Sequence, residues 1–191
     1  NMIHNVVSYS SGYLQIHQKG YWDEQSIDNT FEEDEKLYQE LLKNPNITYL
    51  IPRLQTFALA SYADKTKGVL ILGIDHDKEK EGNNLHEKII DGKYIESINE
   101  NAVVLGEGLA SQLKLKVNDT LVLLGQGYHA SSAAAKYRVK GLIKLGAIEL
   151  NNNVVYMQLN QSQLMHGAEN RLTSVSVMLD KTKKLEKFKE S

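Results

Sequence analysis

Residues 102–124 read AVVLGEGLASQLKLKVNDTLVLL, and this stretch decides the class of fold. Four apolar residues at 102–105 lead into Gly106-Glu107-Gly108, and a helical pattern follows over residues 107–114. A second apolar run occupies residues 119–124. Strand, helix and strand in close succession predict a compact unit of mixed helices and strands.

The Gly-Glu-Gly turn raises the question of a phosphate site, because many nucleotide-binding proteins hold a phosphate between a strand and a helix. A dinucleotide-binding fingerprint needs a third glycine, where this chain has Ser111, and an acidic residue about 20 residues further on, where it has residues 123–126, LLGQ. The P-loop is excluded as well, because no Gly-Lys-Ser/Thr follows. We therefore interpret the glycines as a strand-to-helix turn, with Leu109, Leu113 and Leu115 packing inward.

Composition limits the classes of function. The chain has 191 residues, 41% of them hydrophobic, which is enough for a packed core in one domain or two small ones. Its formal net charge of -2 gives no sign of a basic face for nucleic acid. The absence of cysteine excludes disulfides, thiolate zinc sites and thiol catalysis, and fits either the cytoplasm or a bacterial periplasm. No apolar run approaches the roughly 18 residues that span a bilayer.

Local patterns predict the elements of the first half of the chain. The helix expected within residues 31–45 should bury Leu37, Leu41 and Leu42. In the long strand, Pro52 indicates an edge position or a bulge. The full set is a strand at 13–18, the helix within 31–45, strands at 46–64 and 67–75, a charged loop at 76–84, and a short helix within 85–95 broken at Gly92.

The second half continues the alternation of strands and helices. After the opening stretch we expect a connection at 125–135, strands at 136–143, 154–159 and 173–179, a helix near 161–165, and a basic terminal helix at 181–190. No internal repeat is present.

Other chemical sites find little support in the sequence. Asp75, Asp77 and Glu79 alternate like the first ligands of an EF-hand loop, but that loop requires glycine where this chain has Lys80 and glutamate where it has His86. The histidines are scattered, and no serine lies in a Gly-x-Ser-x-Gly elbow. We therefore expect no metal, no cofactor and no catalytic residue.

Three blocks of sequence occur together in the order of one family. They are SGYLQIHQKGYWDE at 11–24, GVLILGIDHDKE through IIDGKYI to the opening stretch at 68–124, and YRVKGLIKLGAIELNNNVVYMQLNQSQLM at 137–165. In these blocks the chain resembles the periplasmic core domain of MacB-like and FtsX-like ABC transporter permeases, and the lipoprotein-release branch is most similar in the third block.

The resemblance implies an α+β fold in two parts. A ferredoxin-like α/β subdomain would be built from both chain ends, residues 1–66 and 151–191, with an inserted α/β subdomain at 67–150. The crossings near 64–68 and 150–153 would act as hinges, since both are polar and turn-prone. A single fused core, in which these are ordinary surface loops, is the alternative.

The resemblance also implies a place and a role. The domain would be periplasmic, in a permease of the bacterial inner membrane, with membrane helices before Asn5 and after Ser191. It would couple ATP-driven movement of the membrane helices to export or lipoprotein release, without catalysis. Its partners would be the cognate ABC ATPase subunit and a periplasmic or outer-membrane protein, but no nucleic acid. A regulatory module that activates a cell-wall hydrolase, or a small soluble ligand-binding domain, remains an alternative.

One departure from the family pattern concerns the connection at 125–135. Permeases of the lipoprotein-release branch carry a proline-containing hairpin that docks a periplasmic chaperone, and this chain has GQGYHASSAAA without proline. We expect an exposed, flexible hairpin with no partner, and the alternative is a small partner contact at its tip, for which Tyr128 and His129 are the candidates. Tyr21 and Trp22 form a second candidate contact, with ordinary packing as the alternative. We expect the isolated domain to be a monomer.

Overall fold

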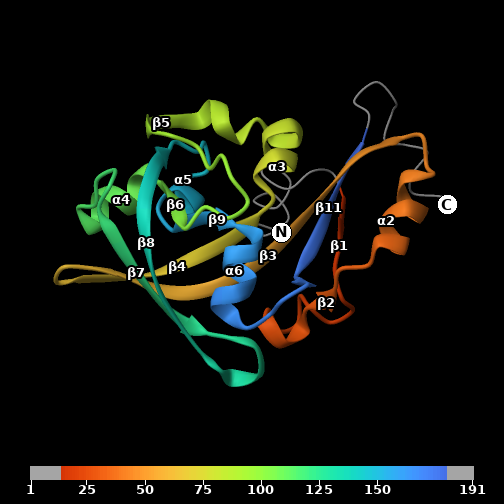
Figure 1. Ribbon diagram of the computed structural model, residues 1–191, viewed down its shortest axis with the longest axis horizontal. Coiled ribbons are helices and arrows are strands. Elements are labelled where there is room, and N and C mark those ends of the chain that lie inside the picture. The colour runs from red at the N-terminus through yellow and green to blue at the C-terminus, as the bar shows by residue number, and fades with distance from the viewer. Residues whose placement is uncertain (1–13, 180–191) are drawn as a thin grey trace.

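The opening stretch folds into a strand, a helix and a second strand, as its pattern predicts: β6 (Ala102–Gly106), α4 (Glu107–Leu113) and β7 (Thr120–Gln126). The computed structural model describes residues 14–179, and Figure 1 shows helices and strands mixed throughout them. The fold is therefore of the α+β class. None of the helices in this range has the length and apolar character that a membrane crossing requires.

The remaining elements alternate along the chain. The strands are β1 (Leu14–Ile16), β2 (Phe31–Glu32), β3 (Ile47–Tyr62), β4 (Lys65–Ile74), β5 (Ile89–Gly92), β8 (Ser132–Ile143), β9 (Val154–Gln158), β10 (Arg171–Leu172) and β11 (Ser174–Leu179). The helices are α2 (Glu35–Leu42), α3 (His76–Asn83), α5 (Ile148–Asn151) and α6 (Leu159–His166), with 3₁₀ turns η1 (Ile27–Asn29), η2 (Leu85–Lys88) and η3 (Tyr128–Ala130).

Six of the strands close into a ring. β3 pairs with β4, β4 with β9, β9 with β6, β6 with β8, and β8 with β7, which returns to β3. The β4–β9 and β6–β8 pairs are parallel, and the other four are antiparallel. On the edge of β3 that β7 uses, β11 pairs with residues 47–53 and β7 with residues 58–61. The long β3 therefore belongs both to the ring and to the small β1–β11 extension.

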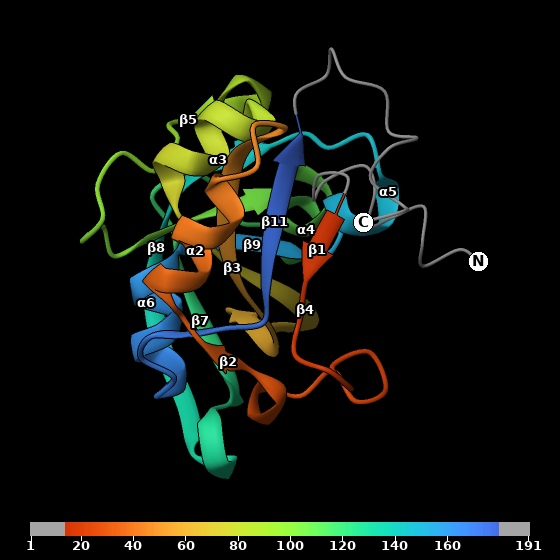
Figure 2. The same ribbon diagram turned by 90° about the vertical axis from the view of Figure 1, so that its right-hand side faces the viewer.

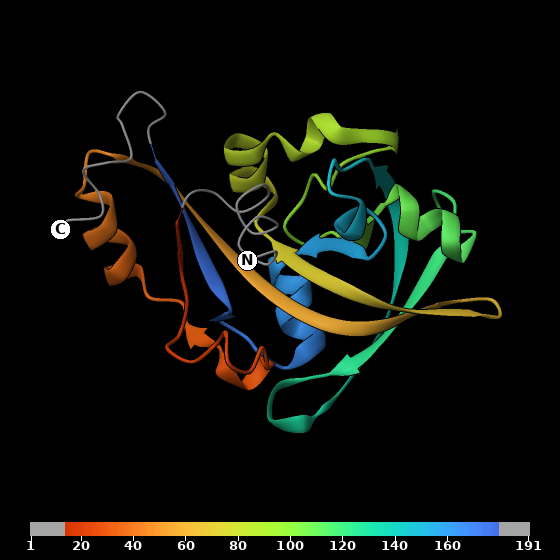
Figure 3. The same cartoon turned by 180° about the vertical axis from the view of Figure 1, so that it is seen from behind.

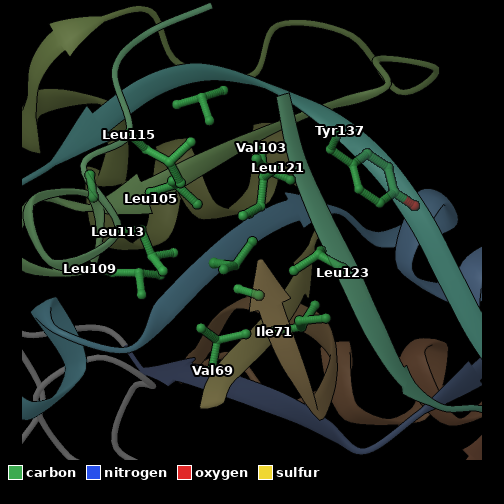
Figure 4. Close-up of a cluster of buried hydrophobic side chains, with 14 of the residues drawn as sticks. Val69, Ile71, Val103, Leu105, Leu109, Leu113, Leu115, Leu121, Leu123 and Tyr137 are labelled. Carbon is green, nitrogen blue, oxygen red and sulfur yellow. The ribbon is translucent and has the colours of Figure 1, made fainter. Parts of the chain in front are cut away.

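Apolar side chains fill the inside of the ring (Figure 4). Every second residue of a strand faces inward, and Ile71 of β4 and Leu121 and Leu123 of β7 are fully buried there. Leu109 and Leu113 of α4 join the same core. The prediction that these leucines pack inward is confirmed.

The two faces of β3 carry different helices, as Figure 2 shows for the α2 side. Leu50 packs with Tyr38 of α2, and Thr56 meets His166 of α6, so the even-numbered residues face these two helices. The odd-numbered Arg53 faces α3. Pro52 pairs only with β11, because the ladder with β4 begins one residue later, so the predicted edge position is confirmed.

Three local predictions are wrong. Residues 76–84 form α3 and not a loop, since Asp75 caps the helix by accepting the N–H groups of Asp77 and Lys78. Residues 85–95 contain a 3₁₀ turn followed by β5, where a short helix was predicted. In α2 the buried residue is Tyr38, Leu37 and Leu41 are partly buried as part of the predicted face, and Leu42 is exposed.

The predicted division into two subdomains stays a prediction. The ring takes strands from both predicted parts, since β3 and β9 lie in the first part and β4, β6, β7 and β8 in the second (Figure 3). The first predicted hinge, at residues 64–68, lies in a tight hairpin, because β3 and β4 remain paired up to Tyr62 and Lys65. The terminal helix predicted at 181–190 lies outside the described residues.

Candidate partner-contact site

The two glycines of the Gly-Glu-Gly turn allow close packing of the backbone. A Cβ atom on Gly106 would lie 2.1 Å from the carbonyl oxygen of Asn151, and one on Gly108 would lie 1.8 Å from Oδ1 of Asn152. The C-terminal end of α5 and the residue that follows it therefore press against this turn and fill the space next to both glycines. Gly106 has a φ of -57°, so the requirement is for space and not for a left-handed backbone. The strand-to-helix interpretation of the turn is confirmed.

The hairpin between β7 and β8 carries the first pair of predicted contacts. Its tip is η3, where His129 and Ala130 adopt left-handed φ values of 53° and 57°. Gly127 passes close to α6, since a Cβ there would lie 2.6 Å from the carbonyl oxygen of His166. The rings of Tyr128 and His129 are 3.9 Å apart. His129 is exposed, whereas Tyr128 is half-buried against Ile27 and Leu54.

The hairpin tip is anchored to two distant segments. The backbone N–H of His129 donates to Oδ1 of Asp28 in η1 at 2.8 Å. The guanidinium of Arg171 lies 4.5 Å from the centre of the Tyr128 ring, and the same Arg171 donates to Oγ1 of Thr30 at 2.7 Å. The expectation of a free hairpin is therefore wrong for Tyr128, and the exposed part of the tip is His129 and Ala130.

The second pair of predicted contacts divides between core and surface. Tyr21 is 2% exposed and stacks on His17 with ring centroids 5.3 Å apart, so ordinary packing describes it. Trp22 is 47% exposed and meets His17 edge-on at 4.9 Å. Burial lowers the pKa of His17 and raises that of Tyr21. Of this pair only Trp22 presents a surface to a partner.

Both pairs are built against one short segment, residues 171–173. Arg171 contacts Tyr128, and the carbonyl oxygen of Thr173 accepts from Nδ1 of His17 at 3.1 Å. We call Trp22, His129 and Ala130 the tip site, and its hairpin part is held by Asp28 and Arg171. Asp28 and Arg171 had no local signal in the sequence, since their contacts with the hairpin tip join residues far apart along the chain, His129 to Asp28 and Tyr128 to Arg171.

A second polar cluster lies where β4 and β9 end. Arg53 of β3 and Glu79 of α3 are 7% and 1% exposed, and Nε of Arg53 donates to Oε1 of Glu79 at 2.5 Å. The second carboxylate oxygen of Glu79 accepts from Asn83 at 2.6 Å. These contacts hold α3 against the sheet. Within residues 14–179 no group of three His, Cys, Asp or Glu side chains could hold a metal ion, and the expectation of a metal-free domain stays a prediction.

A comparison with known proteins identifies the family of this chain. The sequence profile of the MacB-like periplasmic core domain matches residues 2–191. The chain belongs to this family. The resemblance inferred from the three sequence blocks is therefore confirmed.

A curated relative of the MacB-like chain agrees with this assignment. It is 24% identical over 152 residues to the lipoprotein-releasing system transmembrane protein LolE of Haemophilus influenzae, covering 76% of this chain and 36% of LolE. The chain thus spans about a third of the curated relative that it matches.

Two solved structures share the fold. The periplasmic region of MacB from Actinobacillus actinomycetemcomitans has a TM-score of 0.61 at 13% identity, covering 100% of this chain and 85% of that one. The extracellular domain of the ABC-type transporter YknZ from Gram-positive bacteria has a TM-score of 0.60 at 15% identity, covering 84% of this chain and 77% of that one. The fold of these structures agrees with the assignment of this chain as a MacB-like periplasmic core domain.

Proposed function

We propose that this domain transmits ATP-driven movement of the permease's membrane helices to a partner outside the membrane, in export or lipoprotein release, and catalyses no reaction itself. The family match over nearly the whole chain supports the placement in a permease. The similarity to LolE, a protein of a lipoprotein-releasing system, supports lipoprotein release as the process.

The observation that carries this proposal is the anchoring of the hairpin tip. The described ends of the chain, β1 and β11, are neighbouring strands that pair with each other, and β11 also pairs with β3. The segment leading into β11 contains Arg171, and the segment after β1 contains Asp28, and both residues hold the tip. A displacement of the chain ends would therefore reach the tip through a short, hydrogen-bonded path, because packed elements move as units.

The tip site is the contact that we propose for the periplasmic partner. Trp22 and His129 expose aromatic rings there, and such rings are enriched at the energetic centres of protein interfaces. The chain has no proline in this hairpin, in contrast to the chaperone-docking hairpin of the lipoprotein-release branch. The partner would accordingly be recognised by the aromatic tip and not by a proline-shaped loop.

The test uses the full-length permease with its ATPase in spheroplasts. Lipoprotein release into the medium and ATP hydrolysis are measured in the same samples for Trp22→Ala and His129→Ala. We expect release to fall about tenfold when a contact at the centre of the interface is lost, while ATP hydrolysis stays within about twofold. Leu164→Ala is the matched control, since this exposed residue lies on α6.

Unchanged release in both variants would contradict the tip site as the point of contact. A cell-wall hydrolase recovered with the native permease and lost with both variants would favour the regulatory role over release.

A further inference from the structure

One half of β4 has an edge that no other strand of the described residues covers. β3 pairs with β4 along its whole length, from Lys65 to Ile74. β9 covers the opposite edge only from Leu70 onward. Figure 1 shows the β3–β4 hairpin extending beyond the ring. Residues 65–69 of β4 therefore present an open strand edge, which we call the β4 edge, within the part of the chain that the structure describes.

Backbone groups of the β4 edge are directed away from β3. The N–H of Leu70 donates to the carbonyl oxygen of Asn153, just before β9, at 2.9 Å. Because the N–H and C=O groups of a strand alternate in direction, those of Thr66 and Gly68 point the same way as those of Leu70. Both residues are exposed. Unpaired backbone groups on such an edge are a template for pairing with another extended segment.

A hollow lies alongside the β4 edge. It has a volume of about 410 Å³ and lies between β3, β4 and α5, with Phe57, Leu70 and Leu150 in its apolar wall. Gly68 also lines it, and nothing lies within 4 Å of a Cβ placed there. The volume falls in the range of about 300–1,000 Å³ that is typical of binding pockets. The hollow thus has room for an apolar side chain next to the open edge.

The rim of the hollow carries a negative charge. Glu149 of α5 borders the hollow, and no lysine or arginine is among the residues that line it. Glu149 is exposed, and it takes part in none of the ion pairs formed within residues 14–179. Its carboxylate is therefore available to a cation on a bound segment.

We propose that the β4 edge binds an extended segment of a partner protein. The segment adds a strand beside residues 65–69, places an apolar side chain in the hollow and places a lysine or arginine beside Glu149. Strand addition obtains its affinity from main-chain hydrogen bonds and its specificity from pockets for alternate side chains. Thr66 and Gly68 offer the main-chain groups, and the hollow offers the pocket. The tip site lies on other segments of the chain, so this inference stands independently of the proposed function.

Two methylated versions of one peptide test strand addition on the native chain. The probe is a short fluorescent peptide with blocked ends that alternates valine with threonine and carries one lysine. Its binding to the 191-residue chain is followed by anisotropy up to about 1 mM, the effective concentration that a tethered partner reaches. N-methylation of the valine amides removes the donors along one edge of the peptide, and N-methylation of the threonine amides removes those along the other edge.

One methylated version should bind about tenfold or more weakly than the probe, and the other should bind as the probe does. The reason is that only one edge of the peptide pairs with β4. Equal binding by both versions, or no saturable binding of the probe, would overturn the proposal. Self-association of the native chain that competes with the probe would make a second copy the occupant and would also overturn it.

A substitution in the hollow tests where the peptide binds. Gly68→Phe should fill the hollow and weaken binding of the probe about tenfold or more, because the apolar side chain of the peptide loses its pocket. Gly146→Phe is the matched control, since nothing lies within 4 Å of a Cβ there either and Gly146 does not line the hollow. Equal binding by the two variants would place the peptide elsewhere and overturn the proposal.

An exchange of charge tests the contact with Glu149. Glu149→Lys should weaken binding of the lysine probe about threefold, because like charges then meet at the rim of the hollow. A second probe with glutamate in place of lysine should bind Glu149→Lys more tightly than it binds the native chain. Binding of both probes that is the same for the variant and the native chain would overturn the assignment of a basic segment to this edge.

Discussion

Gly106 and Gly108 illustrate how one residue type can be required for two different reasons. In a nucleotide site such glycines let the backbone approach a phosphate. Here they let the C-terminal end of α5 approach the start of α4, with the Asn151 carbonyl oxygen 2.1 Å from where a Cβ of Gly106 would lie. The same local pattern therefore serves a close contact between two segments of one chain. A substitution series at this turn distinguishes the two roles.

Gly106→Ala should lower the free energy of unfolding by about 1–3 kcal/mol, because the added methyl meets backbone that cannot move alone. Glu107→Ala should change it by no more than about 0.5 kcal/mol, since this side chain is partly exposed. Leu109→Ala should cost about 2–5 kcal/mol, because it leaves a cavity in the ring. Urea unfolding of the three variants gives the order, and a larger cost for Glu107→Ala than for Leu109→Ala would mean that the turn is a ligand site.

His166 is a buried base whose protonation opposes folding. Its Nδ1 donates to the Ser162 carbonyl oxygen at 2.7 Å, so in the neutral ring Nε2 accepts from the Thr56 hydroxyl at 3.1 Å. Burial lowers the pKa of His166, and the Ser162 hydrogen bond acts in the opposite direction. A proton on Nε2 would remove the acceptor that Thr56 uses.

The free energy of unfolding should therefore decrease as the pH is lowered below about 6.5, the pKa of histidine in an unfolded chain. In that range His166 is protonated in the unfolded chain and neutral in the folded chain. The free energy of unfolding therefore continues to decrease until the pH reaches the lowered pKa of His166 in the folded state. Urea unfolding at several pH values between about 7 and 5 should show this slope. His166→Gln should reduce the slope without abolishing it, since burial also lowers the pKa of His17. His129→Gln is the exposed control, and an equal reduction with this control would contradict the assignment to His166.

At the scale of elements, α3 shows a helix held by charge. Its sequence HDKEKEGN has no apolar stripe, and the sequence pattern accordingly predicted a loop. The helix forms because Asp75 caps its first turn and Glu79 pairs with Arg53 of β3 inside the protein. The Asp75 cap is a local signal of a helix start, but Arg53 reaches α3 only through tertiary structure, so the pattern of apolar residues did not predict this element. The strands of the ring were predictable, by contrast, because each contains an apolar run or an alternation of apolar and polar residues, although β8 begins at Ser132 and not at residue 136.

Glu79→Leu should lower the free energy of unfolding by about 3–5 kcal/mol, because it leaves the Arg53 charge buried without its carboxylate. Arg53→Met/Glu79→Leu should cost less than the single change, since an apolar pair fills the site without a buried charge. Chemical denaturation measures both. Glu40→Leu serves as control, because its pair with Lys43 is exposed and should contribute no more than about 1 kcal/mol. A double variant less stable than Glu79→Leu would contradict a mainly electrostatic role.

The hairpin tip should be ordered by its anchor and not by its own sequence. Asp28→Ala removes the acceptor of the His129 N–H, so amide hydrogen exchange at residues 127–131 should accelerate about tenfold or more. Exchange in β6 should remain unchanged, because that strand lies in the core of the ring. Ser61→Ala, on the β3–β4 hairpin and away from the tip, is the control. Unchanged exchange at the tip would contradict the anchoring on which the proposed transmission path depends.

For the whole molecule, ring closure was the feature that the sequence could not give. It depends on residues 58–61 pairing with residues 122–125, and such long-range pairings leave no periodic signal. Only part of the tip site could be predicted, because the rest of it depends on long-range contacts. Tyr128 and His129 lie in a loop with an unusual composition and could be selected, whereas Asp28 and Arg171 join them only after folding. The family resemblance depended on the order of three blocks, and this order survives low sequence identity.

The central claim is that the tip site faces a partner outside the membrane and moves with ATP hydrolysis. Its most direct test is thiol labelling of His129→Cys in the full-length permease, freed of any other cysteine, in spheroplasts with a membrane-impermeant maleimide. The account predicts labelling without lysis, at a rate that changes when the ATPase is inactivated by mutation. Labelling only after lysis would place the domain on the cytoplasmic side, and a rate independent of ATP hydrolysis would contradict the proposed transmission.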